Sequence, residues 1–564
     1  MERSIILLAL LIFTGACSKQ LPVIIEGRGI ITGNGMVVSA HQESSRIGAE
    51  ILRKGGNAVD AGVATEFALA VCYPEAGNIG GGGFWILRTN DGSFTMLDYR
   101  EKAPLMSGRN MFLDAEGNVI EGMSTATCMA SGVPGTVDGM LKIHERSGIL
   151  PFSEVIQPAI DLARNGFPLT PGGAASLNSH REAFITRNSY RPDFVKEQPW
   201  QNGDTHREPR LAVTLERIRD YGREGFYSGE TARLIIKEME KGKGIMNMDD
   251  LSGYNAVFRE PLSTDYKGYR ITTASPPSAG GTLLIQLLRM TESRPLAEMG
   301  FHSAGAVHLV AEAQKRAFAD RAEHMGDPDY MLIPVALLAK KEYNEMRMSS
   351  FSENAATFSR NISPGKPDHY ESEETTHYSV VDAMGNAVAA TTTLNGSFGS
   401  SIIVEGAGFL LNNQMDDFSL KPGFPNMYGL IGGEVNSVQP GKKMLSSMSP
   451  SIIEKEGDLF LVLGSPGGST IPTSVFQVIV NVIDFGMSIQ DAVDAGRFHH
   501  QWLPDILYYE RGSLDSVVIS SLRELGHEPR ERSSIGRVNA IQIVKAGKRS
   551  AGADNRGENM ACGY

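Results

Sequence analysis

The stretch TTHYSVVDAMGNAVAATTTLN, residues 375–395, is the most informative part of the chain. Residues 375–381 are rich in β-branched and aromatic types, 382–386 contain turn-forming residues, and 387–393 are small or β-branched. This pattern predicts a β-hairpin. The preceding residues, 349–374, are polar, interrupted by proline and glycine, and without periodicity, which predicts an exposed loop or linker. A hydroxyl residue, Thr375, therefore stands at the start of a strand directly after a linker.

This position gives Thr375 a possible chemical role. A threonine hydroxyl is a weak nucleophile unless a base lies beside it. If the chain were cut before Thr375, the freed α-amine, which titrates near ~7.7–8.0, could be that base. The same hydroxyl could make the cut by attacking the Glu374 carbonyl, giving an ester that water opens, and His377 on the same strand face could assist. From the spacing alone, a threonine pair at a strand start is more often simply a good β-former.

The composition of the whole chain is that of a soluble globular protein. It has 564 residues, of which 41% are hydrophobic and 21% charged. This length exceeds the ~100–200 residues of a typical domain, so a large core can be buried, and disorder or a coiled-coil rod is excluded as the main state. The net charge of −12 argues against nucleic acid as the main partner, because phosphate binding needs a basic face.

Helical and strand-like segments alternate along the chain. Residues 54–72 place valine or phenylalanine every four residues after a candidate N-cap at Asn57, which predicts a helix. A second helix is predicted for residues 303–322, with Gly326 just beyond its end. Strand-like runs occur at 83–87, 94–97 and 459–463. The mixture predicts α/β layering.

The N-terminus is typical of an exported protein. An apolar run, residues 5–13, follows Arg3 and leads to small residues and then Cys17, so residues 1–16 are predicted to be a signal peptide. The run is too short to span a bilayer, which takes about 20 apolar residues. Residues 13–17 also resemble a bacterial lipoprotein signal, although Thr14 and Glu2 depart from that pattern. We therefore expect an exported bacterial protein, either periplasmic or outer-membrane-anchored and extracellular, whose one expected membrane contact is a lipid on Cys17.

The cysteine and histidine positions do not predict a metal or disulfide framework. The chain has four cysteines, and none forms a pair with zinc-ligand spacing. Cys72 and Cys128 stand among small apolar residues, which predicts burial. The glycine run at 80–83 leads into a strand-like segment and not a phosphate-binding helix, and His499-His500 is best explained by packing. No metal and no organic cofactor are expected.

Several motifs, taken together and in order, resemble those of the γ-glutamyltranspeptidases, also called glutathione hydrolases. The hairpin stretch 375–395 resembles the nucleophile segment of that family. The other matching motifs are GGNAVDAGVA (55–64), PEAGNIGGGGF (74–84), DYREKAP (98–104), NNQMDDFS (412–419), LSSMSP (445–450) and GSPGGS (464–469). Motifs that recur in family order are far more specific than any one alone.

The resemblance implies a fold and a division of the chain. The fold is the α/β (α+β) N-terminal-nucleophile hydrolase sandwich, in which two stacked sheets lie between helical layers, αββα. A cut between Glu374 and Thr375 would give a large subunit, residues 17–374, and a small subunit, residues 375–564. The two would remain one intertwined catalytic domain.

The resemblance also implies a role for each motif residue. Thr375 would be the nucleophile, oriented by Thr393, and the N–H groups of Gly467 and Gly468 would form the oxyanion hole. The remaining residues would bind the γ-glutamyl group. Its α-carboxylate would be bound by Arg100, Ser446 and Ser447, and its α-ammonium by Asn395, Gln414 and Asp417. Tyr428, in a lid loop formed by residues 419–433, would cover the bound group.

The implied activity is γ-glutamyl transfer. Glutathione and other γ-glutamyl compounds would be donors, and water, amino acids or dipeptides would be acceptors. Two alternatives stay open. One is an amidase or acylase of the same fold, acting on β-lactams or poly-γ-glutamate. The other is a non-catalytic exported lipoprotein that binds amino acids.

Overall fold

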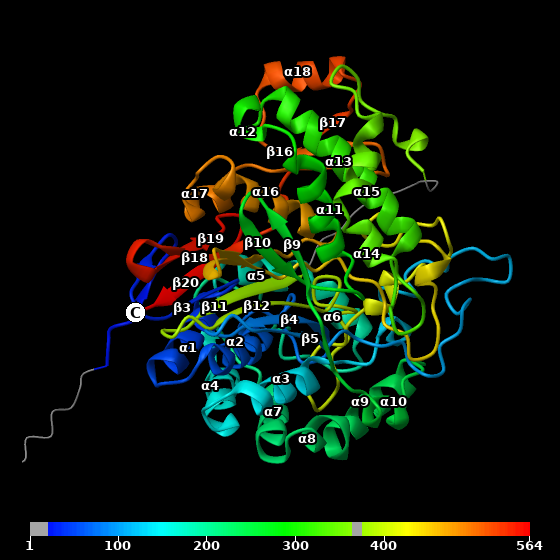
Figure 1. Cartoon of the computed structure of the whole chain (residues 1–564). Helices are drawn as coiled ribbons and strands as arrows, with labels where there is room; N and C mark the ends of the chain where they lie inside the picture. The colour runs from blue at the N-terminus through cyan, green and yellow to red at the C-terminus, as the bar shows by residue number, and fades with distance from the viewer. Residues whose placement is uncertain (1–20, 364–374) are drawn as a thin grey trace, which may run out of the picture.

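The computed structural model describes residues 21–363 and 375–564. The predicted signal peptide, Cys17 and Glu374 lie outside these ranges. Within them, two antiparallel sheets are stacked between layers of helices, so the predicted four-layer αββα arrangement is confirmed (Figure 1). None of the described helices is long and apolar enough to cross a bilayer.

The first sheet has eight strands and contains the predicted hairpin. β11 (Thr376–Val381) and β12 (Ala387–Thr393) pair antiparallel at its centre, from Thr376 opposite Thr392 to Val381 opposite Ala387. The hairpin prediction is therefore confirmed. In spatial order the sheet runs β1 (Ile25–Glu26), β20 (Met560–Gly563), β3 (Met36–Ser39), β11, β12, β4 (Gly82–Arg88), β5 (Phe94–Asp98) and β8 (Val257–Arg259).

The second sheet has seven strands and lies over the first. Its neighbouring strands are also antiparallel. In spatial order it runs β2 (Ile31–Thr32), β19 (Lys548–Ala553), β18 (Asn539–Val544), β14 (Asp458–Gly464), β13 (Ser451–Lys455), β10 (Tyr269–Thr273) and β9 (Leu262–Tyr266).

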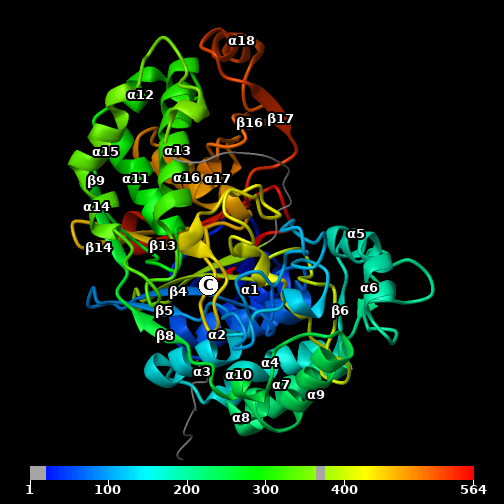
Figure 2. The same cartoon turned by 90° about the vertical axis from the view of Figure 1, so that its right-hand side faces the viewer.

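Helices cover the outer face of each sheet. Those packed on the first sheet include α1 (Gln42–Arg53), α2 (Ala58–Cys72), α4 (Phe152–Asn165) and α7 (Pro209–Tyr221). Those packed on the second sheet include α11 (Gly280–Glu292), α13 (Ala304–His324), α16 (Ile471–Ile483) and α17 (Ile489–Asp494). Figure 2 shows α11, α13 and α16 together above the sheets, and α5 and α6 standing out on one side.

The remaining elements are short or peripheral. They are α3 (Thr136–Ser147), α5 (Pro171–Ser179), α6 (Arg181–Arg187), α8 (Glu224–Tyr227), α9 (Gly229–Lys241), α10 (Met248–Ser252), α12 (Leu296–Met299), α14 (Val335–Leu338), α15 (Lys341–Arg347), α18 (Ser516–Glu524), β6 (Phe167–Pro168), β7 (Thr205–His206), β15 (Phe498–His499), β16 (Leu507–Glu510) and β17 (Pro529–Arg532).

The hydrophobic core follows the layers. One apolar cluster lies between the first sheet and its helices, a second between the two sheets, and a third between the second sheet and its helices. Side chains of β11 alternate between layers because successive residues of a strand point to opposite faces. Tyr378 and Val380 join the helix-side cluster, whereas Val381 joins the cluster between the sheets. The odd-numbered residues of this strand thus face the second sheet.

Helix boundaries follow the capping residues that the sequence contains. α2 begins at Ala58 because Asn57 caps it and Asp60 completes a capping box. α13 begins at Ala304 after the N-cap Ser303, and its last residue, His324, lies two positions past the predicted end. Both helix predictions are confirmed.

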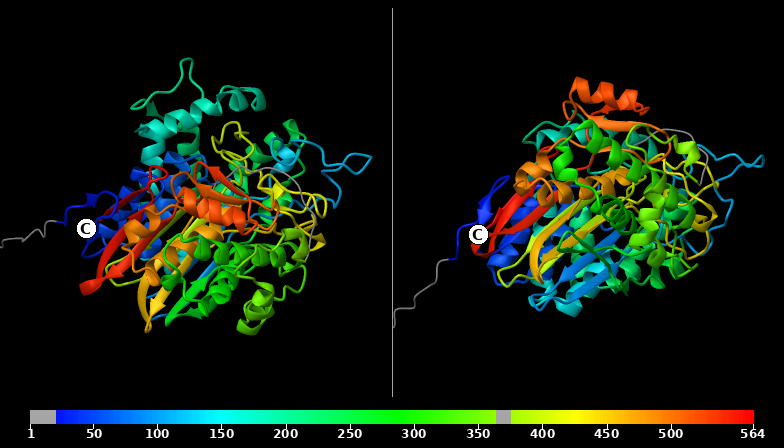
Figure 3. Two further views of the ribbon diagram at one scale, coloured as in Figure 1. Left: turned by 90° about the horizontal axis from the view of Figure 1, so that it is seen from above. Right: turned by 45° about the horizontal axis from the view of Figure 1, so that its top comes forward.

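Both sheets combine strands from before and after residue 375. In the first sheet the later strands β20, β11 and β12 lie among earlier strands. In the second sheet β19 adjoins β2 and β13 adjoins β10, with β18 and β14 between them. Figure 3 shows the red C-terminal strands lying beside the blue N-terminal ones, in agreement with the pairing of β20 with β1 and β3. The parts of the chain on either side of Thr375 are therefore interwoven.

Candidate active site

Thr375 lies at the N-terminal end of β11, at the edge of the space between the two sheets. The strand itself starts one residue later than predicted, at Thr376, because the last ladder pair joins Thr376 to Thr392. The Thr375 side chain is buried, and its Oγ1 lies 3.4 Å from Oγ1 of Thr393 at the end of β12. Thr393 Oγ1 also accepts a hydrogen bond from the Asn395 N–H (2.9 Å). The hairpin thus brings the two predicted hydroxyls together.

A small pocket opens around these hydroxyls. Every residue predicted for the site lines it except Gly467, which is the chain neighbour of the lining residue Gly468. The free space is about 20 Å³, on the scale of one water molecule. The lining residues are Arg100, Arg321, Thr375, Thr393, Asn395, Gln414, Asp417, Tyr428, Leu430, Leu445, Ser446, Ser447, Met448, Gly468 and Ile471.

Arg100 and Asp417 form an ion pair inside this pocket. Arg100 follows β5, is fully buried, and donates from Nη2 to Asp417 Oδ2 (2.5 Å). Its other contacts are to the carbonyl oxygens of Met444 and Leu445 and, at 3.5 Å, to Glu101. A buried guanidinium beside a carboxylate is strongly oriented, since a charge removed from water must be paired. In this structure the two predicted charge-binding groups hold each other.

The three predicted ammonium-binding residues, Asn395, Gln414 and Asp417, all line the pocket. Gln414 Nε2 donates to Asp417 Oδ2 (2.7 Å), while Gln414 Oε1 is buried and accepts no hydrogen bond from any described residue. Asn395 has a φ of +76°, and its Nδ2 donates to the Asn413 carbonyl (3.1 Å). A carboxylate and an amide oxygen are therefore both presented to the pocket, which suits a cationic group.

Gly467 and Gly468 form the turn between β14 and α16. Their φ values are +127° and +50°, in the region that favours glycine. A Cβ on Gly468 would lie 2.7 Å from the Tyr428 ring. Within the described part of the chain, neither N–H donates a hydrogen bond. Both N–H groups are therefore available to a bound molecule, and the oxyanion role implied by the resemblance stays a prediction.

Residues 419–433 cover the pocket. Tyr428 is buried, packs its ring against Gly468, and donates from Oη to the Asn395 carbonyl (2.5 Å). The far end of the segment is tied to α13, because the Gly433 N–H donates to the Ala322 carbonyl (2.9 Å). Tyr428 and Leu430 are the residues of this segment that line the pocket, and the lid role implied by the resemblance stays a prediction.

His377 is not suited to act as a base. Its ring nitrogens contact the hydroxyls of Thr391 (2.9 Å) and Ser379 (3.1 Å). Complete burial lowers the pKa of His377 to about 3, so the ring is neutral at physiological pH. It lies on the strand face of Thr375, as predicted, but it is held as a structural hydrogen-bonding group.

The family model of gamma-glutamyltranspeptidase matches residues 44–564. The chain belongs to the γ-glutamyltranspeptidase family. The match includes the β11–β12 hairpin, the Arg100 motif and the glycine turn at 467–468.

Other members of the γ-glutamyltranspeptidase family are similar over almost the full length. A glutathione hydrolase proenzyme of Escherichia coli (strain K12) is 44% identical over 534 residues, which cover 94% of this chain and 92% of that protein. The glutathione hydrolase proenzyme of Pseudomonas aeruginosa is 43% identical over 531 residues, covering 93% and 94%. An acylase ACY 1 proenzyme of a Pseudomonas species is 36% identical over 517 residues, covering 90% and 89%.

Solved structures support the same fold. Helicobacter pylori γ-glutamyltranspeptidase is 41% identical with a TM-score of 0.57, covering 61% of this chain and 97% of that chain. Cephalosporin acylase from Bacillus halodurans is 25% identical with a TM-score of 0.83, covering 97% and 98%. The predicted N-terminal-nucleophile hydrolase sandwich is thus confirmed.

Sequence reasoning missed several residues of the γ-glutamyltranspeptidase pocket. The most notable is Arg321, near the end of α13, which is 5% exposed. The sequence pattern of α13 predicts a helix, but it does not distinguish Arg321, as a pocket residue, from the other residues of that helix. Leu430, Leu445, Met448 and Ile471 form apolar walls, and their roles depend on tertiary packing alone.

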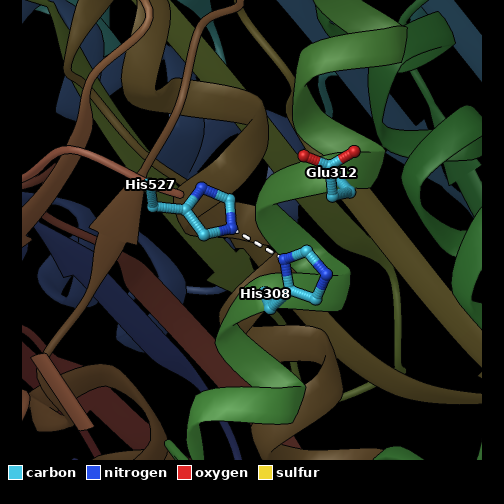
Figure 4. A group of neighbouring side chains, drawn as sticks. All are labelled: His308, Glu312 and His527. Carbon is cyan, nitrogen blue, oxygen red and sulfur yellow. Dashed lines mark hydrogen bonds between the residues drawn. The ribbon is translucent and has the colours of Figure 1, made fainter. Parts of the chain in front are cut away.

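One group of described side chains has the residue types of a metal site. His308 Nδ1 and His527 Nε2 lie 2.7 Å apart, and their ligand atoms and those of Glu312 all lie within 4.8 Å of one another (Figure 4). The Glu312 carboxylate, however, accepts a hydrogen bond from Arg316 (2.7 Å) and lies 3.2 Å from Lys315 Nζ. Because its ligand atoms are already engaged, we assign no metal to this group.

A larger cavity lies apart from the candidate site. It has a volume of about 290 Å³ and is lined by His41, Phe167, His206, Phe398 and residues of the C-terminal segment, among others. It contains none of the predicted site residues. The three described cysteines, Cys72, Cys128 and Cys562, are buried and unpaired. The burial predicted for Cys72 and Cys128 is confirmed.

Proposed function

We propose that this γ-glutamyltranspeptidase cleaves γ-glutamyl amide bonds, including that of glutathione, with Thr375 as nucleophile. The observation that carries the proposal is the composition of the pocket. The side chains that line it include one hydroxyl pair, two guanidinium groups and one carboxylate, and the Gly467-Gly468 turn lies beside them. These groups match the α-carboxylate, the α-ammonium and the reacting carbonyl of a γ-glutamyl group.

The proposed reaction has two steps. Thr375 Oγ1 attacks the γ-carbonyl carbon, the oxyanion accepts hydrogen bonds from Gly467 and Gly468, and the C–N bond breaks as the amine takes a proton through the Thr375 α-amine. Water then attacks the γ-glutamyl ester and releases glutamate, or an amino acid or dipeptide amine takes the group. Thr393 keeps the nucleophile oriented from 3.4 Å. No metal or organic cofactor takes part.

The nucleophile is created by processing. Thr375 Oγ1 attacks the Glu374 carbonyl, and water opens the resulting ester, which frees the α-amine that later acts as the base. The products are a large subunit, residues 17–374, and a small subunit, residues 375–564. The interwoven sheets keep the two chains together.

Export completes the proposal. Residues 1–16 act as a signal peptide, and the protein works in the periplasm or on the outer membrane, where a lipid on Cys17 anchors it. Replacing Cys17 by serine is expected to shift the protein from a membrane pellet to the soluble fraction. If wild type and the variant divide equally between the pellet and the soluble fraction, the N-terminal segment would direct export without anchoring the protein.

The acylase alternative differs in the head group it needs. A glutaryl group lacks the α-ammonium, so it would leave the unsatisfied Gln414 Oε1 without a donor and would bring no positive charge to Asp417 beyond that of Arg100. We therefore expect γ-glutamyl-p-nitroanilide to be hydrolysed at least 100-fold faster, in kcat/KM, than glutaryl-p-nitroanilide. A reversed preference would favour the acylase.

Denaturing mass spectrometry tests the central proposal. Wild-type protein is expected to give two chains that meet between Glu374 and Thr375, and the Thr375→Ala variant one uncut chain. The wild-type protein should release p-nitroaniline from γ-glutamyl-p-nitroanilide, and the variant should not. Uncut wild-type protein that binds glutamate without turnover would instead support an amino-acid-binding protein.

A further inference from the structure

Arg321 is the least explained charged group in the pocket. It lies on α13, is 5% exposed, and lines the same space as Thr375 and Asp417. Its guanidinium forms no hydrogen bond or ion pair with any residue in the described ranges, and its Nε is fully buried. Other cations of the same helix are paired: Lys315 and Arg316 both contact Glu312.

An unpaired buried guanidinium is costly, so its position needs a reason. Burial lowers the pKa of Arg321 to about 10, opposed by the nearby Asp417 charge, and the group stays cationic at neutral pH. Two guanidinium groups and one carboxylate then line the pocket, a formal charge of 2 − 1 = +1. The side chains that line the pocket therefore carry one positive charge more than Asp417 balances, and the neighbouring Glu101 carboxylate contacts Arg100 and not Arg321.

Arg100 alone has little capacity left for a carboxylate. A guanidinium has five N–H donors. In this structure Arg100 directs four contacts to Met444 O, Glu101, Asp417 and Leu445 O, which leaves one N–H. Bidentate recognition of a carboxylate needs two donors. The hydroxyls of Ser446 and Ser447 line the same pocket and can each donate one hydrogen bond, but neither carries a positive charge. A second cation would therefore complete the recognition of a carboxylate without breaking the ion pair between Arg100 and Asp417.

We propose that Arg321 binds the α-carboxylate of the γ-glutamyl group together with Arg100. This inference rests on the proposed γ-glutamyl specificity. The α-carboxylate is the only anionic part of the γ-glutamyl group, and Arg321 is the cation of the pocket that lacks a partner among the described residues. Because Arg321 supplies part of the hydrogen bonding to the α-carboxylate, Arg100 can keep its ion pair with Asp417. The Asp417 carboxylate then stays in position to bind the α-ammonium.

The test compares ligands with and without this carboxylate. Wild-type protein, Arg321→Gln and Arg321→Lys are assayed for KM and kcat with γ-glutamyl-p-nitroanilide, and for competitive inhibition by L-glutamate and by 4-aminobutanoate, which lacks the α-carboxylate. Glu323→Gln is the matched control, since it changes a charge on the exposed face of the same helix. Mass spectrometry first establishes that each protein is processed.

The expected result is selective. Arg321→Gln should raise KM and the L-glutamate inhibition constant by roughly 10- to 100-fold, the effect of losing hydrogen bonds to a charged group. Its kcat should stay within about threefold, and inhibition by 4-aminobutanoate should not weaken. Arg321→Lys, which keeps the charge but not the planar donors, should be intermediate, and Glu323→Gln should resemble wild type.

Three results would overturn the inference. An unchanged KM in Arg321→Gln would show that the residue does not bind substrate. If L-glutamate and 4-aminobutanoate bind equally more weakly to the variant, Arg321 would act through Asp417 or through the fold and not through the α-carboxylate. If Arg321→Gln is not processed, the Arg321→Lys variant provides the test. If that variant prefers L-glutamate over 4-aminobutanoate as strongly as wild type does, carboxylate binding by Arg321 is refuted. Failure of wild-type protein to hydrolyse the donor would instead refute the proposed function.

Discussion

Removing the hydroxyl of Tyr428 should loosen the cover of the pocket by a predictable amount. Tyr428→Phe deletes the hydrogen bond from Oη to the Asn395 carbonyl at 2.5 Å and leaves the ring packed against Gly468. A neutral buried hydrogen bond contributes about 0.5–1.5 kcal/mol. Because 1.4 kcal/mol corresponds to a factor of ten, the closed state should lose roughly 2- to 10-fold in population relative to the open one.

The effect should appear in substrate retention. If the closed lid holds the γ-glutamyl group, KM for γ-glutamyl-p-nitroanilide should rise about 5-fold in Tyr428→Phe, with little change in kcat. Tyr428→Ala also removes the ring that covers Gly468, so its KM should rise more than 10-fold. Steady-state kinetics on processed protein measures both values.

A matched control separates the lid contact from general loosening of the segment. Phe424 lies in the same covering segment, is 44% exposed, and does not line the pocket. Phe424→Ala should therefore keep the wild-type KM. Wild-type KM in both Tyr428 variants, or an equal rise in Phe424→Ala, would refute the reasoning.

Three further predictions concern the nucleophile, the glycine turn and pH. Thr393→Val removes the hydroxyl 3.4 Å from Thr375 Oγ1 and should lower kcat at least 10-fold and slow self-cleavage; normal rates would contradict an orienting role. Gly468→Ala puts a Cβ 2.7 Å from the Tyr428 ring at a φ of +50°, so kcat/KM should fall by about 10²-fold or more, and retained activity would argue against this oxyanion site. Burial raises the pKa of Glu66 from 4.5 to about 7, so its contribution to stability is present below about pH 4.5 and lost as pH rises through 7. Relative to Glu66→Gln, the wild-type free energy of unfolding should fall by at most about 3 kcal/mol between pH 4.5 and 7.5 in denaturant titrations, and parallel curves would contradict that pKa.

Local signals in the sequence predicted the elements that build the site. Alternating β-branched residues around a turn predicted β11 and β12, and the Asn57 capping box predicted the start of α2. The error at the start of β11 was one residue, because ladder pairing with Thr392 and not residue type determines where a strand begins. The pocket residues came from motif order, since residues as distant as Arg100 and Asp417 meet only through sheet stacking.

Tertiary packing determined what the sequence did not reveal. Arg321 lies on a helix buried along most of its length, and the neighbouring charges of that helix are paired within it. Its lack of a partner among the described residues becomes visible only when the lid and the Asp417 loop are placed above it. The number of unused N–H donors on Arg100 cannot be predicted from the sequence either, since two of its contacts are to backbone carbonyls.

The interwoven sheets have a consequence for the proposed mature enzyme. Strands from both sides of Thr375 adjoin one another in each sheet, so the surface between the two processed chains would be the protein's own core and not an interface added to it. Such a pair would consist of two polypeptide chains but would fold and unfold as a single unit. Dilution could not separate it, neither half could be exchanged with another molecule, and parting the chains would be the same event as denaturing them.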